Sequence, residues 1–135
     1  MATNPHFKLS WRDASLNTFT TSLSASAIFR IYAGTQPADV SSATTAGNTL
    51  CASLTFPSTN AFGASSGGVI TANTITSDAN ASGGTATWFT ICTSTNTRFA
   101  DGSVGTSGAD LNLNSTTITT GATVAISSFT VTIPA

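Results

Sequence analysis

The chain has 135 residues, of which 40% are hydrophobic and only 7% carry a charge. Globular proteins average about 25% charged residues, whereas here four basic and five acidic residues give a net charge of −1. This balance argues against electrostatic binding to nucleic acid or to an acidic membrane surface. No apolar run approaches the roughly 18 residues of a membrane-spanning helix, and residues 1–7 lack the apolar core of a signal peptide. Because Ser and Thr make up about a third of the chain, we expect a folded domain with a surface of hydroxyl and amide groups.

Residues 1–26 are predicted to form an N-terminal arm and a short helix, with the helix over residues 11–23. Ser10, with Asp13 three residues later, resembles the capping box that begins many helices. Apolar residues then recur at helical spacing and form one stripe over two turns, namely Leu16, Phe19 and Leu23.

Residues 27–135 are predicted to form a single β domain. Short runs of β-favouring residues alternate there with clusters of Gly, Ser, Asn and Asp, which is typical of an all-β fold. The expected architecture is a mainly β, antiparallel sandwich (jelly-roll-like) of about six to eight strands. The runs are Ala27–Tyr32, Thr49–Phe56, Gly68–Ser77, Thr85–Thr93, Arg98–Asp101, Leu111–Asn114, Thr116–Thr119 and Ala122–Ile133.

Two of these runs depart from simple alternation. In Ala122–Ile133 the apolar positions change parity, and a bulge near Ser127 and Ser128 would restore them to one face. In Thr85–Thr93 apolar side chains occur on both faces. That strand, with Trp88, is therefore expected to lie centrally or to be covered by the N-terminal helix or by a neighbouring subunit.

Two connecting segments are also predicted from local composition. Asp101-Gly102 follows a β-favouring run and is a frequent hairpin-turn dipeptide, so a turn is expected there. The segment Thr35–Asn48 has the composition of a surface loop.

The sequence offers few groups for catalysis or for binding a metal. His6, the only histidine, lies in the terminal arm, and nothing in the sequence pairs two aspartates, so turn and loop roles are expected for the carboxylates. The pattern Asp110-x-Asn112-x-Asn114 imitates a calcium loop, but Ser115 and Gly121 occupy the positions that need Gly and Glu. We therefore expect no enzyme activity, no cofactor and no metal site.

Cys51 and Cys92 are the only cysteines. A disulfide is possible if their strands are neighbours, but in a chain without an export signal two free, packed thiols are favoured.

Four stretches of the chain resemble a family of small structural proteins encoded by tailed bacteriophages and prophages. These stretches are Phe29–Pro37, Gly67–Asp78, Gly84–Phe89 and, most distinctively, Asp101–Asn114. The resemblance begins at residue 27 and does not cover the N-terminal dozen residues. It implies a role in particle assembly and supplies no catalytic residues.

Two hypotheses follow from the residues and the resemblance. The first is a capsid decoration (cement) protein that binds the major capsid protein as a homotrimer, in a virion assembled in the host bacterial cytoplasm. Its expected contact residues are Phe7, Trp11 and Trp88. The alternative is a phage tail or fibre-associated binding module that recognises the host surface. Neither hypothesis involves nucleic acid or a membrane.

Overall fold

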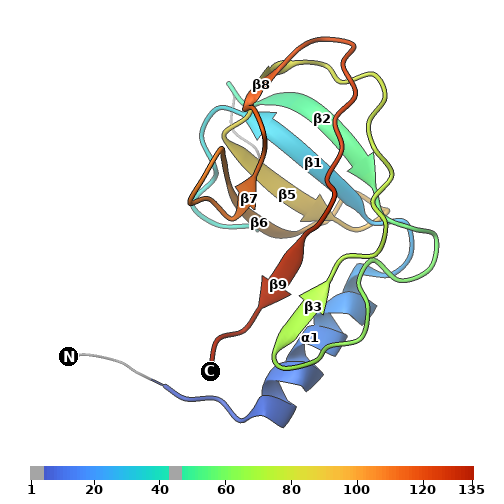
Figure 1. The fold of residues 1–135 in the computed structure, drawn as a ribbon, viewed down its shortest axis with the longest axis vertical. Helices are drawn as coiled ribbons and strands as arrows, with labels where there is room; N and C mark the ends of the chain where they lie inside the picture. The colour runs from blue at the N-terminus through green and yellow to red at the C-terminus, as the bar shows by residue number, and fades with distance from the viewer. Residues whose placement is uncertain (1–4, 43–46) are drawn as a thin grey trace.

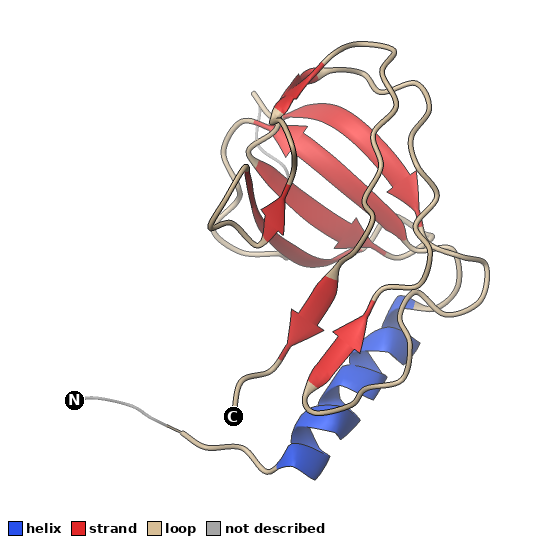
Figure 2. Cartoon of the chain, in the orientation of Figure 1, coloured by secondary structure: helices blue, strands red, loops and turns tan. Residues whose placement is uncertain are grey.

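One helix precedes nine short strands in the computed structural model, which describes residues 5–42 and 47–135 (Figure 1). The chain is thus mainly β with a single N-terminal helix in the described residues, as predicted (Figure 2). The elements in chain order are α1 (Leu9–Leu23), β1 (Ile28–Ala33), β2 (Thr49–Thr55), β3 (Val69–Thr71), β4 (Gly84–Thr85), β5 (Trp88–Cys92), β6 (Arg98–Gly105), β7 (Leu111–Asn112), β8 (Thr117–Ile118) and β9 (Thr130–Thr132).

The largest sheet is curled and mixed, with the strand order β2-β1-β5-β6-β7. Its neighbours are antiparallel except β6 and β7, which run parallel, so the expectation of a purely antiparallel sheet is wrong. Two smaller pairs, β3–β9 and β4–β8, complete the strand pairing. The predicted jelly-roll-like sandwich is not confirmed by this arrangement.

An aromatic cluster fills the inner face of the large sheet. Phe29 of β1 stacks on Phe89 of β5, with ring centroids 4.8 Å apart. Phe129, just before β9, meets both rings edge-on at 5.2 and 5.5 Å. Such edge-to-face and offset pairs are favoured because the positive ring edge meets the negative ring face. The segment that leads into β9 therefore closes the core from the side opposite the sheet.

Strand pairing is interrupted in Ala122–Ile133, the segment in which the apolar positions change from even to odd residue numbers. β3 pairs with β9, and the Ala72 N–H continues that pairing by donating to the Phe129 carbonyl. The two segments then separate and meet again where Asp78 bridges to Val124. Ser127 lies in this gap, so the predicted single-residue bulge is replaced by a longer unpaired stretch.

The helix begins earlier than predicted and without the expected capping box. Lys8 is the N-cap and makes no side-chain capping bond, while Ser10 lies inside the helix. The Asp13 carboxylate instead accepts a hydrogen bond from the distant Gly68 N–H at 2.9 Å. Arg12 donates to the Ile133 carbonyl at 3.0 Å. Through these two bonds the helix holds Gly68, just before β3, and Ile133, just after β9. No helix in the described residues is long and apolar enough to cross a membrane.

The predicted hairpin turn at Asp101-Gly102 is wrong, because both residues lie inside β6. The turn between β5 and β6 comes earlier, where the Thr93 N–H donates to the Thr97 carbonyl and Asn96 has a φ of 66°. Gly102 pairs in register with Phe89. A Cβ atom at Gly102 would lie 2.8 Å from the Phe89 ring, so glycine is required there by close packing.

Candidate interaction surface

Trp88 lies on the outer face of the large sheet, yet its side chain is fully buried, with 0% of its surface exposed. Its ring stacks on Tyr32 of β1 at 4.7 Å, and the Arg98 guanidinium lies 5.3 Å from the ring centroid. A cation placed over an indole face is attracted by the ring quadrupole. The Trp88 indole N–H donates to the Asn48 side chain at 3.3 Å.

The segment between β1 and β2 covers this cluster. Arg98 donates to the Ser42 carbonyl and to the Asp101 carboxylate, and Gln36 donates to the same carboxylate at 2.8 Å. The cover expected over Trp88 is therefore the chain's own loop. β5 is the middle strand of the large sheet, so the central position expected for the Trp88 strand is confirmed. The loop, and not the N-terminal helix, covers Trp88, whose side chain has no exposed surface for a contact in the described chain.

All five carboxylates accept hydrogen bonds from groups of the chain itself. Such bonds stabilise turns and hold distant segments together. Asp39, Asp78 and Asp110 lie outside the helix and the named strands, as expected, whereas Asp101 lies inside β6 and the expected turn role is wrong for it. The donors are Gly68 to Asp13, Ser41 to Asp39, Ser53 and Asn80 to Asp78, Gln36 and Arg98 to Asp101, and Ser103 to Asp110.

Two residues of the calcium-like pattern, Asp110 and Asn112, also bond within the chain. The Ser103 N–H and hydroxyl both donate to one Asp110 carboxylate oxygen at 2.8 Å. The backbone N–H of Ser103 is the main cause that lowers the pKa of Asp110, and the hydroxyl adds to the effect. The Asn112 side chain accepts from the Ala109 N–H at 3.1 Å. Within the described residues no three His, Cys, Asp or Glu side chains are grouped as a metal would require.

Cys51 and Cys92 are free and buried, as predicted. Removal from water raises the pKa of the Cys51 thiol, because burial disfavours the thiolate. Cys51 is therefore a packing residue and a poor nucleophile at neutral pH.

The arm, residues Phe7–Trp11, consists of the end of the N-terminal segment and the first turn of α1, and it carries the most exposed large apolar side chains. Phe7, Leu9 and Trp11 are 44%, 46% and 51% exposed. The Phe7 and Trp11 rings stack at 4.8 Å, so the two aromatic residues predicted to form contacts lie together at one end of the molecule. Leu9 was missed by the sequence analysis, although the alternation of Phe7, Leu9 and Trp11 could have revealed it.

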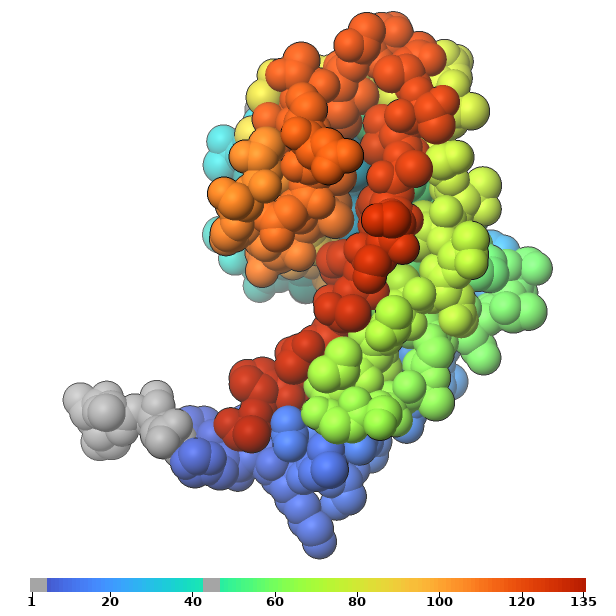
Figure 3. Space-filling view, viewed as in Figure 1, coloured from blue at the N-terminus to red at the C-terminus, as the bar shows by residue number. Residues whose placement is uncertain are grey.

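A notch of about 260 Å³ opens between the large sheet and β9. Figure 3 shows an indentation in the surface between the β body above and the red C-terminal segment and blue helix. Aromatic and aliphatic side chains line its floor, and Asp110 lies among its lining residues. The lining is formed by Phe19, Phe89, Ile91, Ala100, Asp101, Asp110 and residues Phe129–Thr132.

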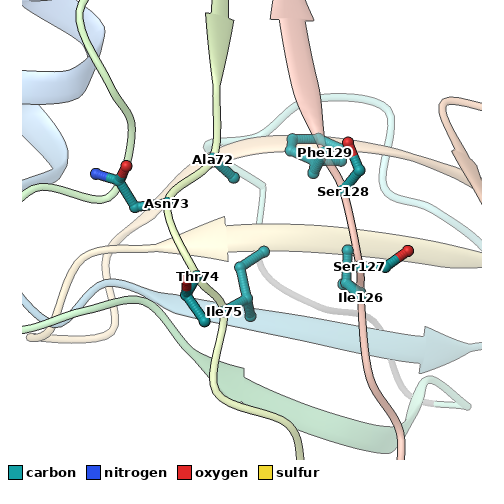
Figure 4. Close-up of a pocket in the computed structure, with 8 residues that line it drawn as sticks. All are labelled: Ala72, Asn73, Thr74, Ile75, Ile126, Ser127, Ser128 and Phe129. Carbon is teal, nitrogen blue, oxygen red and sulfur yellow. The ribbon is translucent and has the colours of Figure 1, made fainter.

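A second cavity of about 230 Å³ lies where the β3 and β9 segments separate. In Figure 4 Ile75 points into the space between these segments, whereas Ser127 points away from it. Its other lining residues are Ala72, Asn73, Thr74, Ile126, Ser128 and Phe129. The lining holds no titratable side chain, so this cavity offers no group for acid–base chemistry.

Comparisons with known protein families, with curated proteins and with solved structures find no match for this chain.

Proposed function

We propose that this protein is a structural protein of a bacteriophage virion, a capsid decoration (cement) protein that binds and stabilises the shell of major capsid protein as a homotrimer. The observation that carries the proposal is the aromatic arm, where Phe7 stacks on Trp11 with both rings about half exposed. Exposed apolar side chains that lie together mark contact surfaces more often than free surfaces.

The small number of charged side chains without a partner in the chain supports the same function. Among the described residues, Lys8 is the one charged residue whose side chain makes no hydrogen bond or ion pair within the chain. Apart from the arm and the internally bonded charged residues, most exposed residues in the described part of the chain have hydroxyl, amide or small side chains. Such a surface can pack against other chains without burying unpaired charges, which is costly.

We also infer that the fold is a reduced sandwich of the jelly-roll-like kind. The large sheet supplies Phe29 and Phe89 from one side of the core, and the segment before β9 supplies Phe129 from the other. Two β layers that face each other across an aromatic core are the basis of such folds. Here the second layer consists of the interrupted β3–β9 ribbon.

The proposal is tested by mixing purified protein with expanded empty capsids of the phage that encodes it. We expect saturable binding at a copy number near that of the major capsid protein, measured by co-sedimentation and gel densitometry. The matched control is a variant with Phe7→Ser and Trp11→Ser, which should fold normally by circular dichroism and bind poorly.

The location on the particle separates this function from its alternative. Antibody–gold label over the shell agrees with decoration. Label confined to the tail would instead favour the tail or fibre-associated module that recognises the host surface. Absence of the protein from salt-washed virions would overturn both assignments.

A further inference from the structure

We propose that the arm of one copy, residues Phe7–Trp11, binds in the notch of a second copy. This inference deepens the proposed function, on which its role in a shell rests, by naming the two surfaces that join neighbouring copies. The arm and the notch are complementary in three respects. Both present apolar side chains, the arm carries a positive charge and the notch a negative one, and the notch offers a free strand edge to the extended backbone of the arm.

The apolar match concerns the floor of the notch. Its volume of about 260 Å³ is below the roughly 300–1,000 Å³ typical of small-molecule sites, and it suits a side-chain anchor. Phe19, Phe89 and Val131 contribute to its apolar lining. Aromatic anchors in such depressions supply much of the energy of protein interfaces, and the arm presents Phe7 and Trp11 for that role.

The charge match is between Lys8 and Asp110. Lys8 is exposed between Phe7 and Leu9, and its side chain makes no bond to the described residues. Asp110 is exposed and lines the notch, and the Ser103 N–H lowers its pKa, so the carboxylate is ionised at neutral pH. A cation on the arm and an anion at the notch orient the two surfaces toward each other.

The backbone match concerns the free edge of β9. The Phe129 carbonyl accepts from Ala72, and the Ile133 N–H donates to the Gly68 carbonyl, so odd-numbered residues bond toward β3. In an antiparallel pair the intervening residues point the other way, and the backbone groups of Thr130 and Thr132 therefore face the notch. An extended segment could add to this edge as a further strand. The arm residues that precede α1, Phe7 and Lys8, can supply such a segment, since Lys8 has an extended backbone with φ −59° and ψ 136°, whereas Leu9 and Trp11 lie in the first turn of α1.

The arm lies away from the notch of its own chain. The bond from Arg12 to the Ile133 carbonyl holds the start of the helix against the C-terminal segment. From there the described part of the arm runs sideways below the C-terminus in Figure 1, and none of its residues lines the notch of its own chain. A contact from arm to notch joins two different surfaces, and repetition of such a contact can close a ring such as the proposed trimer.

Sedimentation velocity of the full chain over a wide concentration range tests the contact. We expect self-association that weakens at high salt. Lys8→Asp should raise the dissociation constant by at least about tenfold, because close interfacial charge pairs couple by about 1.5 kcal/mol or more. Asp110→Lys should do the same, and the double variant K8D/D110K should recover most of the lost affinity. A chain that stays monomeric, or an association unchanged by K8D, would overturn the contact.

Asp110 also supports β6 through Ser103, so D110K can fail to fold. Asp110→Asn keeps an acceptor for Ser103 and removes only the charge, and it should weaken association by itself. Trp11 supplies a second measurement, since Trp88 is already buried and its emission should not change. The emission of the wild type should shift to shorter wavelength as concentration rises, and Trp11→Phe should abolish that shift. The Trp11 emission is the difference between the wild-type and Trp11→Phe spectra, and a blue shift of that difference independent of concentration would place the arm on its own chain and refute the contact.

The two proposals fail separately. A monomer that still binds capsids removes the contact between copies and leaves the decoration function. A protein that self-associates through the arm but binds no capsid keeps the contact between copies and removes the decoration function.

Discussion

Gly102 allows a direct test of how the core determines the sequence of β6. A Cβ atom added there would lie 2.8 and 2.9 Å from two atoms of the Phe89 ring and 3.0 Å from the Asp110 carboxylate. Its backbone is not in the left-handed region, so alanine is excluded by packing and not by conformation. Overpacking of this kind costs about 1–3 kcal/mol. Alanine also lowers the conformational entropy of the unfolded chain, and this stabilises the folded state by about 0.4–1 kcal/mol.

We therefore expect Gly102→Ala to lower the free energy of unfolding by about 1–2 kcal/mol. For a chain of this length the melting temperature should fall by roughly 4–8 °C. Urea unfolding followed by circular dichroism measures the first quantity and a thermal scan the second. The matched control is Gly63→Ala, whose Cβ would come no closer than 3.8 Å to the Thr71 carbonyl. That variant should stay within about 0.5 kcal/mol of the wild type.

A double-mutant cycle identifies the steric partner. In a Phe89→Leu background the ring is absent, so the cost of Gly102→Ala should fall by more than about 0.5 kcal/mol, the limit of simple additivity. Equal costs in both backgrounds would refute the argument that the Phe89 ring requires glycine. Equal losses for Gly102→Ala and Gly63→Ala would refute it as well.

Three further predictions concern the core, the acid response and the thiols. Phe129→Ala removes the ring that meets both Phe29 and Phe89, and should cost about 3–5 kcal/mol in urea unfolding. Asp110→Asn should destabilise the protein at pH 7, and its difference from the wild type should shrink at pH 3. The lowered pKa of Asp110 stabilises the fold above the unfolded-state pKa, and this contribution is lost as the pH falls through the folded-state value. A difference that is constant between these pH values would contradict the Ser103 bonds. Because Cys51 and Cys92 are both buried, a thiol reagent such as Ellman's should react with neither in the native protein and with both in denaturant.

The sequence predicted those features that depend on local periodicity. The helical spacing of Leu16, Phe19 and Leu23 predicts the helix, and Leu16 and Leu23 are both buried in it. The capping-box pattern of Ser10 and Asp13 predicts a later start than Leu9, where the helix begins. The carboxylate of Asp13 instead bonds to Gly68, 55 residues away, and no local pattern reports such a contact.

The features that could not be predicted depend on partners distant in sequence. Asp101-Gly102 has the composition of a turn, but Gly102 is required by the Phe89 ring across the strand pair. The cover of Trp88 comes from Asn48, 40 residues earlier, and from the Arg98 contact to Ser42. The notch was missed for the same reason, because it forms only where β9 passes the edge of the large sheet.

The few charged residues of the chain have identifiable roles within the fold, with one exception. Arg12, Arg30 and Arg98 each donate to an acceptor within the chain, and all five carboxylates accept in the same way. Charged side chains are thus retained where a turn or a junction between segments needs a strong hydrogen bond. Lys8 departs from this rule, and it lies on the arm between two exposed apolar residues. A charged side chain without a partner in its own chain can bind an opposite charge on another molecule. Such pairs contribute more to the specificity and orientation of an interface than to its affinity. Exchange of Lys8 for a neutral Gln should therefore leave the stability of the fold unchanged while it weakens association between copies, which is the pattern expected of a contact residue.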